Sequence, residues 1–518
     1  MAENEPLILT IDFGTQSVRA SIFDKRGNAL AMEKEVYAPA YFSPKPGFAE
    51  QDPDYYFRCL CGCTKRLVES HGDLLPRVKG ITETCFRDSA VLLDEANQVV
   101  RPMILWLDQR FAKCDKPLSL KSRFLFKIVG MSETIRVNRQ RTVSNWLIEN
   151  EPENWARVKK YLSVSTYFIF RLTGQMKEAS ASQIGHYPLD YKNRAWYQDP
   201  EHHLQGQIFS IKKTQLCELV PEGSFIAGVS EEASKLTGLP VGMPIYACGA
   251  DKSCETLGAG VIDSTMASIS LGTACTIETT TKKWVAPEKF LPAYPSVLPD
   301  YYNMDVQIYR GYWMINWFLK EFGAKNVNDI VIDDVDADEY NKDLLHIPAG
   351  SDGLVLQPYW GAPLSHPLVK GAIVGFSDVT TREHVYKAII EGISYALREA
   401  KEGFEKNLKH TFASLRISGG GSKSDSICQI TADVFGIPVS RVQTHETSSL
   451  GAAIAGFLAV HEFRDPYEAV QQMVHESDVF TPDTKNHEAY NYLYQNAYRK
   501  LYPSLRSTYE SLCYFTRR

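Results

Sequence analysis

The sequence predicts an α/β protein with two domains of one design and a ligand-binding cleft between them. A buried strand, a Gly-Thr turn and a returning strand occur near the start of each half of the chain, with the Gly-Thr pairs at residues 14–15 and 272–273. A third segment, around residue 420, places three consecutive glycines between a strand and a helix. Repetition of one unit indicates internal duplication, and glycine-rich turns let the backbone approach a ligand closely.

The first unit starts at residues 7–11, an apolar and β-branched run that is typical of a buried strand. It continues through a turn of small residues at 12–17 into a second strand over 18–24. A turn at 25–28 then leads to a third strand. The chain is therefore expected to begin as a β-meander whose first turn carries glycine and hydroxyl groups.

The second unit repeats this arrangement in the other half of the chain. Residues 267–271 form the expected strand, Gly272 and Thr273 form the turn, and residues 274–279 form the returning strand. The backbone N–H groups of such turns can cradle phosphate oxygens, although either turn alone fits an ordinary hairpin equally well. Two such turns that face each other across two domains would form a phosphate clamp.

The third segment, residues 415–425, predicts a strand, a flat glycine backbone and a helix over about 424–435. Exposed backbone and helix N–H groups at this position favour nucleotide binding over a plain flexible loop. No Gly-Lys-Ser/Thr follows at Walker A spacing, and the first strand–turn lacks Gly-x-Gly-x-x-Gly, which argues against the two commonest nucleotide folds. The arrangement that remains is the actin-like one, in which two phosphate hairpins and an adenosine loop enclose ATP in an interdomain cleft.

The composition excludes several classes of function. Charged residues make up 23% of the 518 and the formal net charge is −6, without the basic excess that nucleic-acid binding demands. The alternating Cys59, Cys61 and Cys63 lack a second ligand cluster with metal spacing, so reduced thiols are favoured over a metal site. The first residues are polar and the first apolar run is too short for a signal sequence or a membrane span. We therefore expect a cytoplasmic protein that binds neither nucleic acid nor membrane.

Seven segments, in order, resemble the FGGY family of carbohydrate kinases, which includes glycerol kinase, xylulokinase and ribulokinase. They span nearly the whole chain and lie at residues 12–19, 104–110, 249–251, 371–391, 418–424, 432–439 and 446–453. The family implies two ribonuclease-H-like (actin-like ATPase) domains, which we place at residues 1–244 and 245–518. The N-terminal domain would carry the first phosphate loop and the acceptor site, and the C-terminal domain the second phosphate loop, the adenosine site and the last helices. ATP and Mg2+ are the implied cofactors, and hinge closure is expected because water must be excluded.

Two carboxylates are the expected centre of the chemistry. Asp251 follows a strand at a Gly-Ala turn that would expose its side chain to the cleft. The residues alone fit a helix N-cap equally well, and the resemblance favours a catalytic base. Asp12 ends a buried strand, where a carboxylate is costly unless something binds it. Mg2+ held through water is its expected partner, with a hydrogen-bonded turn residue as the alternative.

The resemblance assigns ATP to the two Gly-Thr turns and to the glycine-rich segment. The residues expected to contact the phosphates are Gly14, Thr15, Gln16, Ser17, Arg19, Gly272 and Thr273. The residues expected near adenosine are Gly420 and Gly421, with Asn316 and Asp425 as further contacts.

Arg87 and Asp88 occupy the segment that reads the acceptor in this family, where glycerol kinases have Arg-Glu and xylulokinases have Met-His. An arginine and a carboxylate can donate to and accept from adjacent hydroxyls, and the alternative is a surface ion pair. Asn138 stands where glycerol kinases place a substrate-contacting tyrosine, and Lys252 stands where family members usually have Gln. Lys252 could attract a sugar acid, hold the γ-phosphate or point to solvent.

The sequence thus predicts an ATP-dependent kinase that phosphorylates a hydroxyl of a small sugar or polyol. A ketopentose or a polyol is favoured over a sugar acid. A non-catalytic sugar or ATP sensor of the same fold is the further alternative, and Asp251 and both Gly-Thr turns argue against it. Trp106, Asp108 and Arg110 are interpreted as structural. Homodimers occur in the family, so a homodimer is compatible with this prediction.

Overall fold

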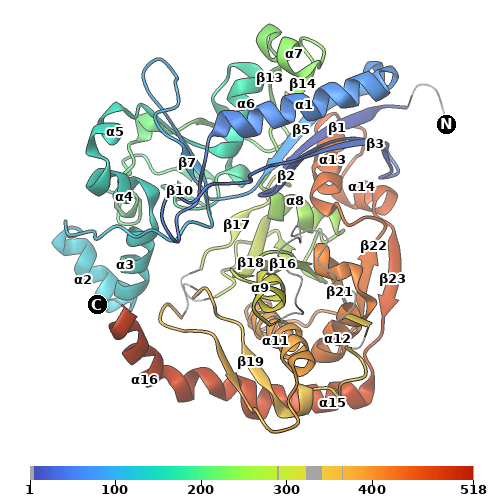
Figure 1. The fold of residues 1–518 in the computed structure, drawn as a ribbon. Coiled ribbons are helices and arrows are strands. Elements are labelled where there is room, and N and C mark those ends of the chain that lie inside the picture. The colour runs from blue at the N-terminus through green and yellow to red at the C-terminus, as the bar shows by residue number, and fades with distance from the viewer. Residues whose placement is uncertain (1–4, 289–290, 323–340, 343, 364–365, 517–518) are drawn as a thin grey trace.

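Each half of the chain folds around one mixed β-sheet that is flanked by helices (Figure 1). The computed structural model describes residues 5–288, 291–322, 341–342, 344–363 and 366–516. The predicted α/β class with two domains is confirmed.

The first sheet has six strands in the order β13-β14-β5-β1-β2-β3. In that order they are Phe225–Gly228, Pro244–Tyr246, Val78–Cys85, Leu7–Phe13, Ser17–Phe23 and Ala29–Val36. The neighbours β1, β2 and β3 are antiparallel, as the predicted meander requires, whereas β5 is parallel to β1 and to β14. β14 begins at the expected domain boundary, residue 244, and pairs with β5, so the first sheet extends past that boundary.

The second sheet has seven strands in the order β17-β18-β16-β15-β21-β22-β23. In that order they are Tyr294–Pro295, Tyr302–Ile308, Cys275–Thr281, Ala267–Leu271, Leu415–Ser418, Val439–Val442 and Glu476–Phe480. From β18 to β23, successive neighbours are antiparallel, antiparallel, parallel, parallel and antiparallel. The first sheet has the same pattern when it is followed from β3 to β13. The duplication predicted from the two Gly-Thr turns therefore extends over both sheets. The C-terminal domain, expected to carry the last helices of the chain, also contributes the edge strand β23 from the segment after residue 466.

The remaining elements surround these sheets and connect them. The helices are α1 (Pro53–His71), α2 (Leu120–Ile128), α3 (Ser132–Arg141), α4 (Val143–Asn150), α5 (Pro152–Arg157), α6 (Val164–Thr173), α7 (Glu231–Thr237), α8 (Asp251–Gly258), α9 (Trp313–Phe322), α11 (Arg382–Leu408), α12 (Asp425–Phe435), α13 (Thr447–Ala459), α14 (Pro466–Met473), α15 (Thr484–Leu493) and α16 (Arg499–Thr516). A four-stranded sheet has the order β4 (Glu50–Gln51), β7 (Met103–Ile104), β6 (Ala90–Leu93) and β8 (Lys160–Ser163). Three two-stranded sheets pair β9 (Lys177–Ala179) with β12 (Glu218–Val220), β10 (Leu189–Asp190) with β11 (Ala195–Trp196), and β19 (Val355–Gln357) with β20 (Ala372–Val374).

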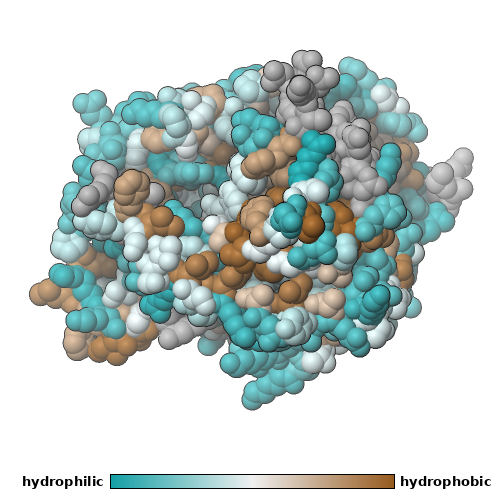
Figure 2. Space-filling view, turned by 60° about the horizontal axis from the view of Figure 1, so that its bottom comes forward, coloured by the Kyte–Doolittle hydropathy of each residue, from teal (hydrophilic) through white to brown (hydrophobic). Residues whose placement is uncertain are grey.

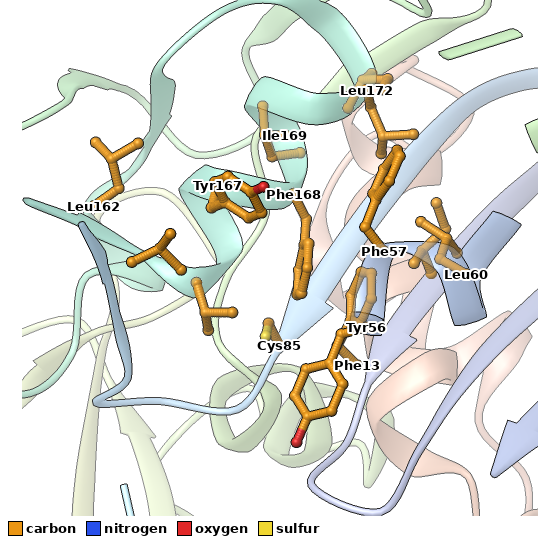
Figure 3. Packing of buried hydrophobic residues seen from close by; sticks show 14 of the residues in the cluster. Phe13, Tyr56, Phe57, Leu60, Cys85, Leu162, Tyr167, Phe168, Ile169 and Leu172 are labelled. Atoms are coloured by element: carbon orange, nitrogen blue, oxygen red, sulfur yellow. The ribbon is translucent and has the colours of Figure 1, made fainter. Parts of the chain in front are cut away.

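Aromatic side chains fill the core between the first sheet and its helices (Figure 3). Phe13 at the end of β1 stacks on Phe168 of α6, with ring centroids 3.8 Å apart and planes 13° apart. Tyr56 and Phe57 of α1 pack into the same cluster and are almost fully buried. Burying each such side chain contributes about 1.5–3 kcal/mol, so this cluster holds the end of β1, and the turn after it, in a fixed place.

Two helices cross closely where the halves of the chain meet. A Cβ atom on Gly258 of α8 would lie 1.9 Å from the Thr447 carbonyl oxygen, and one on Gly451 of α13 would lie 1.8 Å from the Cys254 carbonyl oxygen. Only glycine permits this approach. α13 also packs against β1 and β5 (Figure 1). The crossing therefore fixes α8, which begins at Asp251, relative to the first sheet.

Among the described residues, no helix combines the length and apolar character needed to cross a bilayer. Polar residues cover much of the face in Figure 2, and apolar side chains gather near its centre and along one lower edge. Leu120, Phe124 and Ile128 of α2 are among the exposed apolar side chains. Surface apolar side chains of this kind occur on ordinary globular proteins.

Candidate active site

A cavity of about 530 Å³ is lined by residues from both halves of the chain. It receives side chains from the first turn, the acceptor segment, the start of α8 and the second turn. The sequence-predicted site residues that line it are Thr15, Arg87, Asp88, Asn138, Asp251, Lys252, Gly272 and Thr273. The fold thus places the expected base, both Gly-Thr turns and the acceptor segment around one space.

Asp251 is the first residue of α8, and its Oδ1 accepts a hydrogen bond from the Lys252 backbone N–H at 2.8 Å. Burial raises the pKa of Asp251, while Lys252 and Arg87 act in the opposite direction. The Nε of Arg87 lies 3.9 Å from Asp251 Oδ1. A carboxylate whose pKa is raised by burial, yet which lies beside cations, is suited to take a proton from a hydroxyl.

Asp12 lies at the end of β1 and is only 5% exposed. Burial raises its pKa to about 7, against the opposing effect of Arg19. Its Oδ2 accepts a hydrogen bond from Ser449 at 3.3 Å and lies 3.9 Å from Arg19 Nη1. The Nε of Arg19 lies 3.0 Å from Glu446, so this guanidinium is shared between two carboxylates. A divalent cation would offset the cost of ionising Asp12, which makes this oxygen donor a fit for Mg2+.

Hydrogen bonds hold both Gly-Thr turns in place. Gly14 N–H donates to the Ser17 carbonyl oxygen at 2.9 Å, and Trp106 Nε1 donates to Thr15 Oγ1 at 3.1 Å. In the second turn, the Gly272 carbonyl oxygen accepts from Tyr312 N–H at 3.0 Å. Of the expected residues in the first turn, Thr15 lines the cavity, whereas Gly14, Gln16, Ser17 and Arg19 are not among the described residues that line it.

The glycine-rich segment lies directly behind the second turn. A Cβ atom on Gly419, whose φ is +81°, would lie 2.9 Å from the backbone of Leu271, the residue before Gly272. Gly420 and Gly421 begin a short 3-10 turn that leads into α12. The glycine-rich segment and the second turn are therefore in direct contact.

Two further residues expected near adenosine lie at the helices beside this segment. Asn316 is a half-buried residue of α9, and Asp425 is the first residue of α12. Asp425 Oδ1 accepts a hydrogen bond from Arg441 at 2.6 Å. Neither residue belongs to the lining that the described part of the chain gives the cavity.

Arg87 connects the two halves of the chain. Its Nη1 donates to Asp305 Oδ2 of β18 at 2.6 Å, and the two side chains are 14% and 4% exposed. Burial acts against the charge of Arg87, but Asp305 and Asp251 raise its pKa above the ordinary value. Glu278 pairs with Asp305 across β16 and β18, and burial and Asp305 together raise its pKa. Arg87 therefore balances a group of buried acids as well as lining the cavity.

Lys252 does not point to solvent. Its Nζ lies 2.6 Å from Glu255 Oε2 and 3.0 Å from Ser270 Oγ. Burial lowers the pKa of Lys252, but Glu255 and Asp251 outweigh it and raise the pKa above the ordinary value. Glu255 Oε1 accepts in turn from Ser418. The lysine charge is thus neutralised by a neighbouring residue of the same helix.

Several residues that line the cavity are not among the site residues predicted from the sequence. His186, Trp106, Asp305, Tyr191 and Tyr294 line the cavity. Trp106, which is interpreted as structural from the sequence, lines the cavity and donates a hydrogen bond to Thr15, a predicted ATP contact. His186 follows the glycine of a Gln-Ile-Gly-His segment, and its sequence offers no signal beyond a polar residue after glycine.

Asp108 and Arg110 form a buried pair, with Arg110 Nη2 2.7 Å from Asp108 Oδ2 and 2.7 Å from Glu50 Oε1. Neither residue lines the cavity in the described part of the chain. They connect segments of the N-terminal half, in agreement with the structural interpretation.

A duplicated mixed sheet, with two Gly-Thr turns and a carboxylate at one cavity, is the arrangement of a two-domain protein of the actin-like fold. Residues 7–258 match the N-terminal domain of the FGGY family of carbohydrate kinases, and residues 267–460 match its C-terminal domain. The chain belongs to this family and is a carbohydrate kinase. The resemblance inferred from seven sequence segments is confirmed.

Similar proteins cover nearly the full length. A xylulose kinase of Lactococcus lactis is 28% identical over 496 residues, which are 94% of this chain and 95% of that protein. The crystal structure of a xylulose kinase from Lactobacillus acidophilus has a TM-score of 0.81 at 23% identity, covering 98% of this chain and all of the other. A gluconate kinase structure from the same organism has a TM-score of 0.80 at 23% identity, with the same coverage. The fold is thus shared by enzymes named for a ketose and for a sugar acid.

Proposed function

We propose that this carbohydrate kinase transfers the γ-phosphate of ATP to a hydroxyl of a neutral ketose or polyol, with Asp251 as the catalytic base. The observation that supports the proposal is the cavity that joins Asp251 to Thr15, Gly272 and Thr273. A phosphoryl group bound between the two turns would lie next to a carboxylate that can take the hydroxyl proton.

Asp12 would hold Mg2+, which supplies charge neutralisation on the phosphates when it is bound. The buried carboxylate of Asp12, with its raised pKa, supports this assignment. Gly14, Gln16, Ser17 and Arg19 would complete the first phosphate site, and Gly420 and Gly421 would flank the adenosine.

The charge balance of the cavity favours a neutral acceptor over a sugar acid. In the described lining, the lysine and arginine side chains are Lys252 and Arg87, and each lies against carboxylates. The same lining contains Asp88, Asp251 and Asp305. A substrate carboxylate would therefore enter an acidic site without an unpaired cation, and ATP would add further negative charge.

The remaining lining suits a polyhydroxylated chain. Asn138 and His186 offer donors and acceptors for hydroxyl groups. Trp106 and Tyr294 offer aromatic faces for the C–H groups of a sugar. This combination of a few polar groups among aromatic side chains is typical of small-molecule sites.

The test is ADP release from Mg-ATP with D-xylulose, D-ribulose, glycerol and D-gluconate as acceptors. We expect a neutral acceptor to give the highest kcat/KM. Asp251→Asn should lower kcat for that acceptor by about 10²–10⁴-fold while leaving the Kd of ATP unchanged. The control Asp378→Asn changes an exposed carboxylate on the turn after β20 and should leave both quantities unchanged.

Two results would contradict the proposal. The highest kcat/KM for D-gluconate would show that the cavity accepts a carboxylate and would reverse the argument from charge. An Asp251→Asn variant with near wild-type kcat would remove Asp251 from the role of base.

A further inference from the structure

The acceptor segment and the loop after β9 are held together at one tight contact. Asp88 has a φ of 59°, and its backbone N–H donates to the Ile184 carbonyl oxygen at 3.2 Å. Gly185 has a φ of 136°, and a Cβ atom there would lie 2.3 Å from Asp88 Oδ1. The Tyr191 hydroxyl donates to the Gly185 carbonyl oxygen at 2.9 Å. The two loops therefore have a fixed relative position, which only glycine at 185 allows.

The contact places His186 against Asp88. The His186 backbone N–H donates to Asp88 Oδ1 at 2.8 Å, and Nδ1 lies 2.7 Å from Oδ2 and 2.9 Å from Oδ1. Because a carboxylate only accepts, Nδ1 carries the hydrogen of this bond. The imidazole also packs edge-to-face on Phe209, with ring centroids 6.4 Å apart. The orientation of the His186 ring is thus fixed by Asp88 and by Phe209.

The pairing changes which group faces the acceptor. Both oxygens of Asp88 are engaged by His186, and Arg87 is engaged by Asp305. The His186 side chain lines the cavity, is 22% exposed, and its Nε2 makes no hydrogen bond within the described part of the chain. In the neutral imidazole with hydrogen on Nδ1, Nε2 is an acceptor for a hydroxyl hydrogen.

We infer that His186 is a specificity-determining residue, whose Nε2 accepts a hydrogen bond from an acceptor hydroxyl, and that Asp88 is a positioning residue acting through it. The inference rests on the proposed function, because it concerns the acceptor of that reaction. A site built to hydrogen-bond a hydroxyl rejects compounds that do not present one there, since the buried partner is then left unpaired. The ligand class is a neutral ketose or polyol with a hydroxyl directed at His186.

Two substitutions at this position separate the two ring nitrogens. His186→Asn retains an amide near Nδ1 that can donate to Asp88, and it removes the atom at Nε2. His186→Gln places an amide near the position of Nε2 and gives up the geometry of the bond to Asp88. The matched control is His202→Asn, because His202 forms the same Nδ1–carboxylate pair with Asp199 at 2.9 Å but is 83% exposed.

KM and kcat are measured for ATP and for D-xylulose, D-ribulose, glycerol and D-gluconate. For the best acceptor, we expect His186→Asn to raise KM about 10–100-fold and His186→Gln to recover part of the loss. The KM of ATP should change less than about twofold, since the contact involves only the acceptor. The His202→Asn control should match the wild type throughout.

The outcomes distinguish the inference from the function on which it rests. If the wild type phosphorylates an acceptor and His186→Asn leaves the acceptor KM and the ranking of the four compounds unchanged, the inference is overturned while the proposed function stands. An equal rise in KM for ATP and acceptor would show a general structural role and would also overturn it. A wild type that phosphorylates none of the four would overturn the proposed function, and the inference with it.

Discussion

Removing Arg87 from its ion pair with Asp305 should destabilise the protein more than removing Asp305. Asp305→Asn removes one partner of Arg87 but leaves Asp251 3.9 Å away. It also relieves Glu278, whose pKa is raised first by burial and then by Asp305. Arg87→Met does the opposite, because it leaves Asp305 and Glu278 as neighbouring buried acids without their cation.

The expected losses of stability depend on how deeply the pair is buried: the side chains of Arg87 and Asp305 are 14% and 4% exposed. Leaving a buried charge without its partner costs about 3–5 kcal/mol, which we expect for Arg87→Met. Asp305→Asn removes one hydrogen bond to a charged group, worth about 1.5–3 kcal/mol, and relief of Glu278 reduces this loss. The double variant should cost less than the sum of the two single variants, because the two sites are in direct contact.

The assay is urea unfolding followed by tryptophan fluorescence for the wild type, both single variants and the double variant. Arg66→Met provides the control, since the Arg66–Glu35 pair has a similar 2.6 Å separation at side-chain exposures of 42% and 35%. Its loss should cost less than about 1 kcal/mol. A cost for Asp305→Asn equal to or larger than that for Arg87→Met, or costs for both no larger than the control, would refute the reasoning.

Three further substitutions test the site and its surroundings. Asp12→Asn should raise the Mg2+ concentration for half-maximal activity about 10–100-fold without changing acceptor KM, and an unchanged Mg2+ requirement would remove Asp12 from the metal site. Gly185→Ala should lower kcat/KM for the acceptor about 10²-fold, because its Cβ would displace Asp88; wild-type kinetics would show that the loop contact has no functional importance. Burial raises the pKa of Glu83 to about 8, and the opposing effect of the hydrogen bond from Ser165 is smaller. Between pH 4.5 and 8, Glu83 is therefore protonated in the folded state and ionised in the unfolded state. The contribution of Glu83 to the free energy of unfolding is fully present below pH 4.5 and is lost as the pH rises to 8. The free energy of unfolding of Glu83→Gln should therefore rise relative to that of the wild type by up to about 1.4 kcal/mol per pH unit in that window. Urea unfolding from pH 5 to 9 measures the difference, and a difference independent of pH would contradict the assignment.

Local patterns were sufficient for the strands and turns that carry the phosphate site. The predicted strand at residues 267–271 is β15, and the predicted helix over about 424–435 is α12, Asp425–Phe435. Apolar runs and glycines act within a few residues, so their consequences can be read from short segments. The edge strand β23 was missed, because its Glu476–Phe480 segment is mostly exposed and polar and pairs only through the neighbour β22.

The sequence by itself determined the two-domain class, the duplication, the family and the aspartate at the start of α8. Only the tertiary structure decided which charges meet. Arg87 pairs with a residue 218 positions away, and Asp88 with one 98 positions away. The sequence left Lys252 open between a sugar acid, the γ-phosphate and solvent, although its partner Glu255 lies on the same helix. The physical reason is that secondary structure follows from local side-chain periodicity, whereas a charge pairs with whatever the packing of distant loops brings within reach.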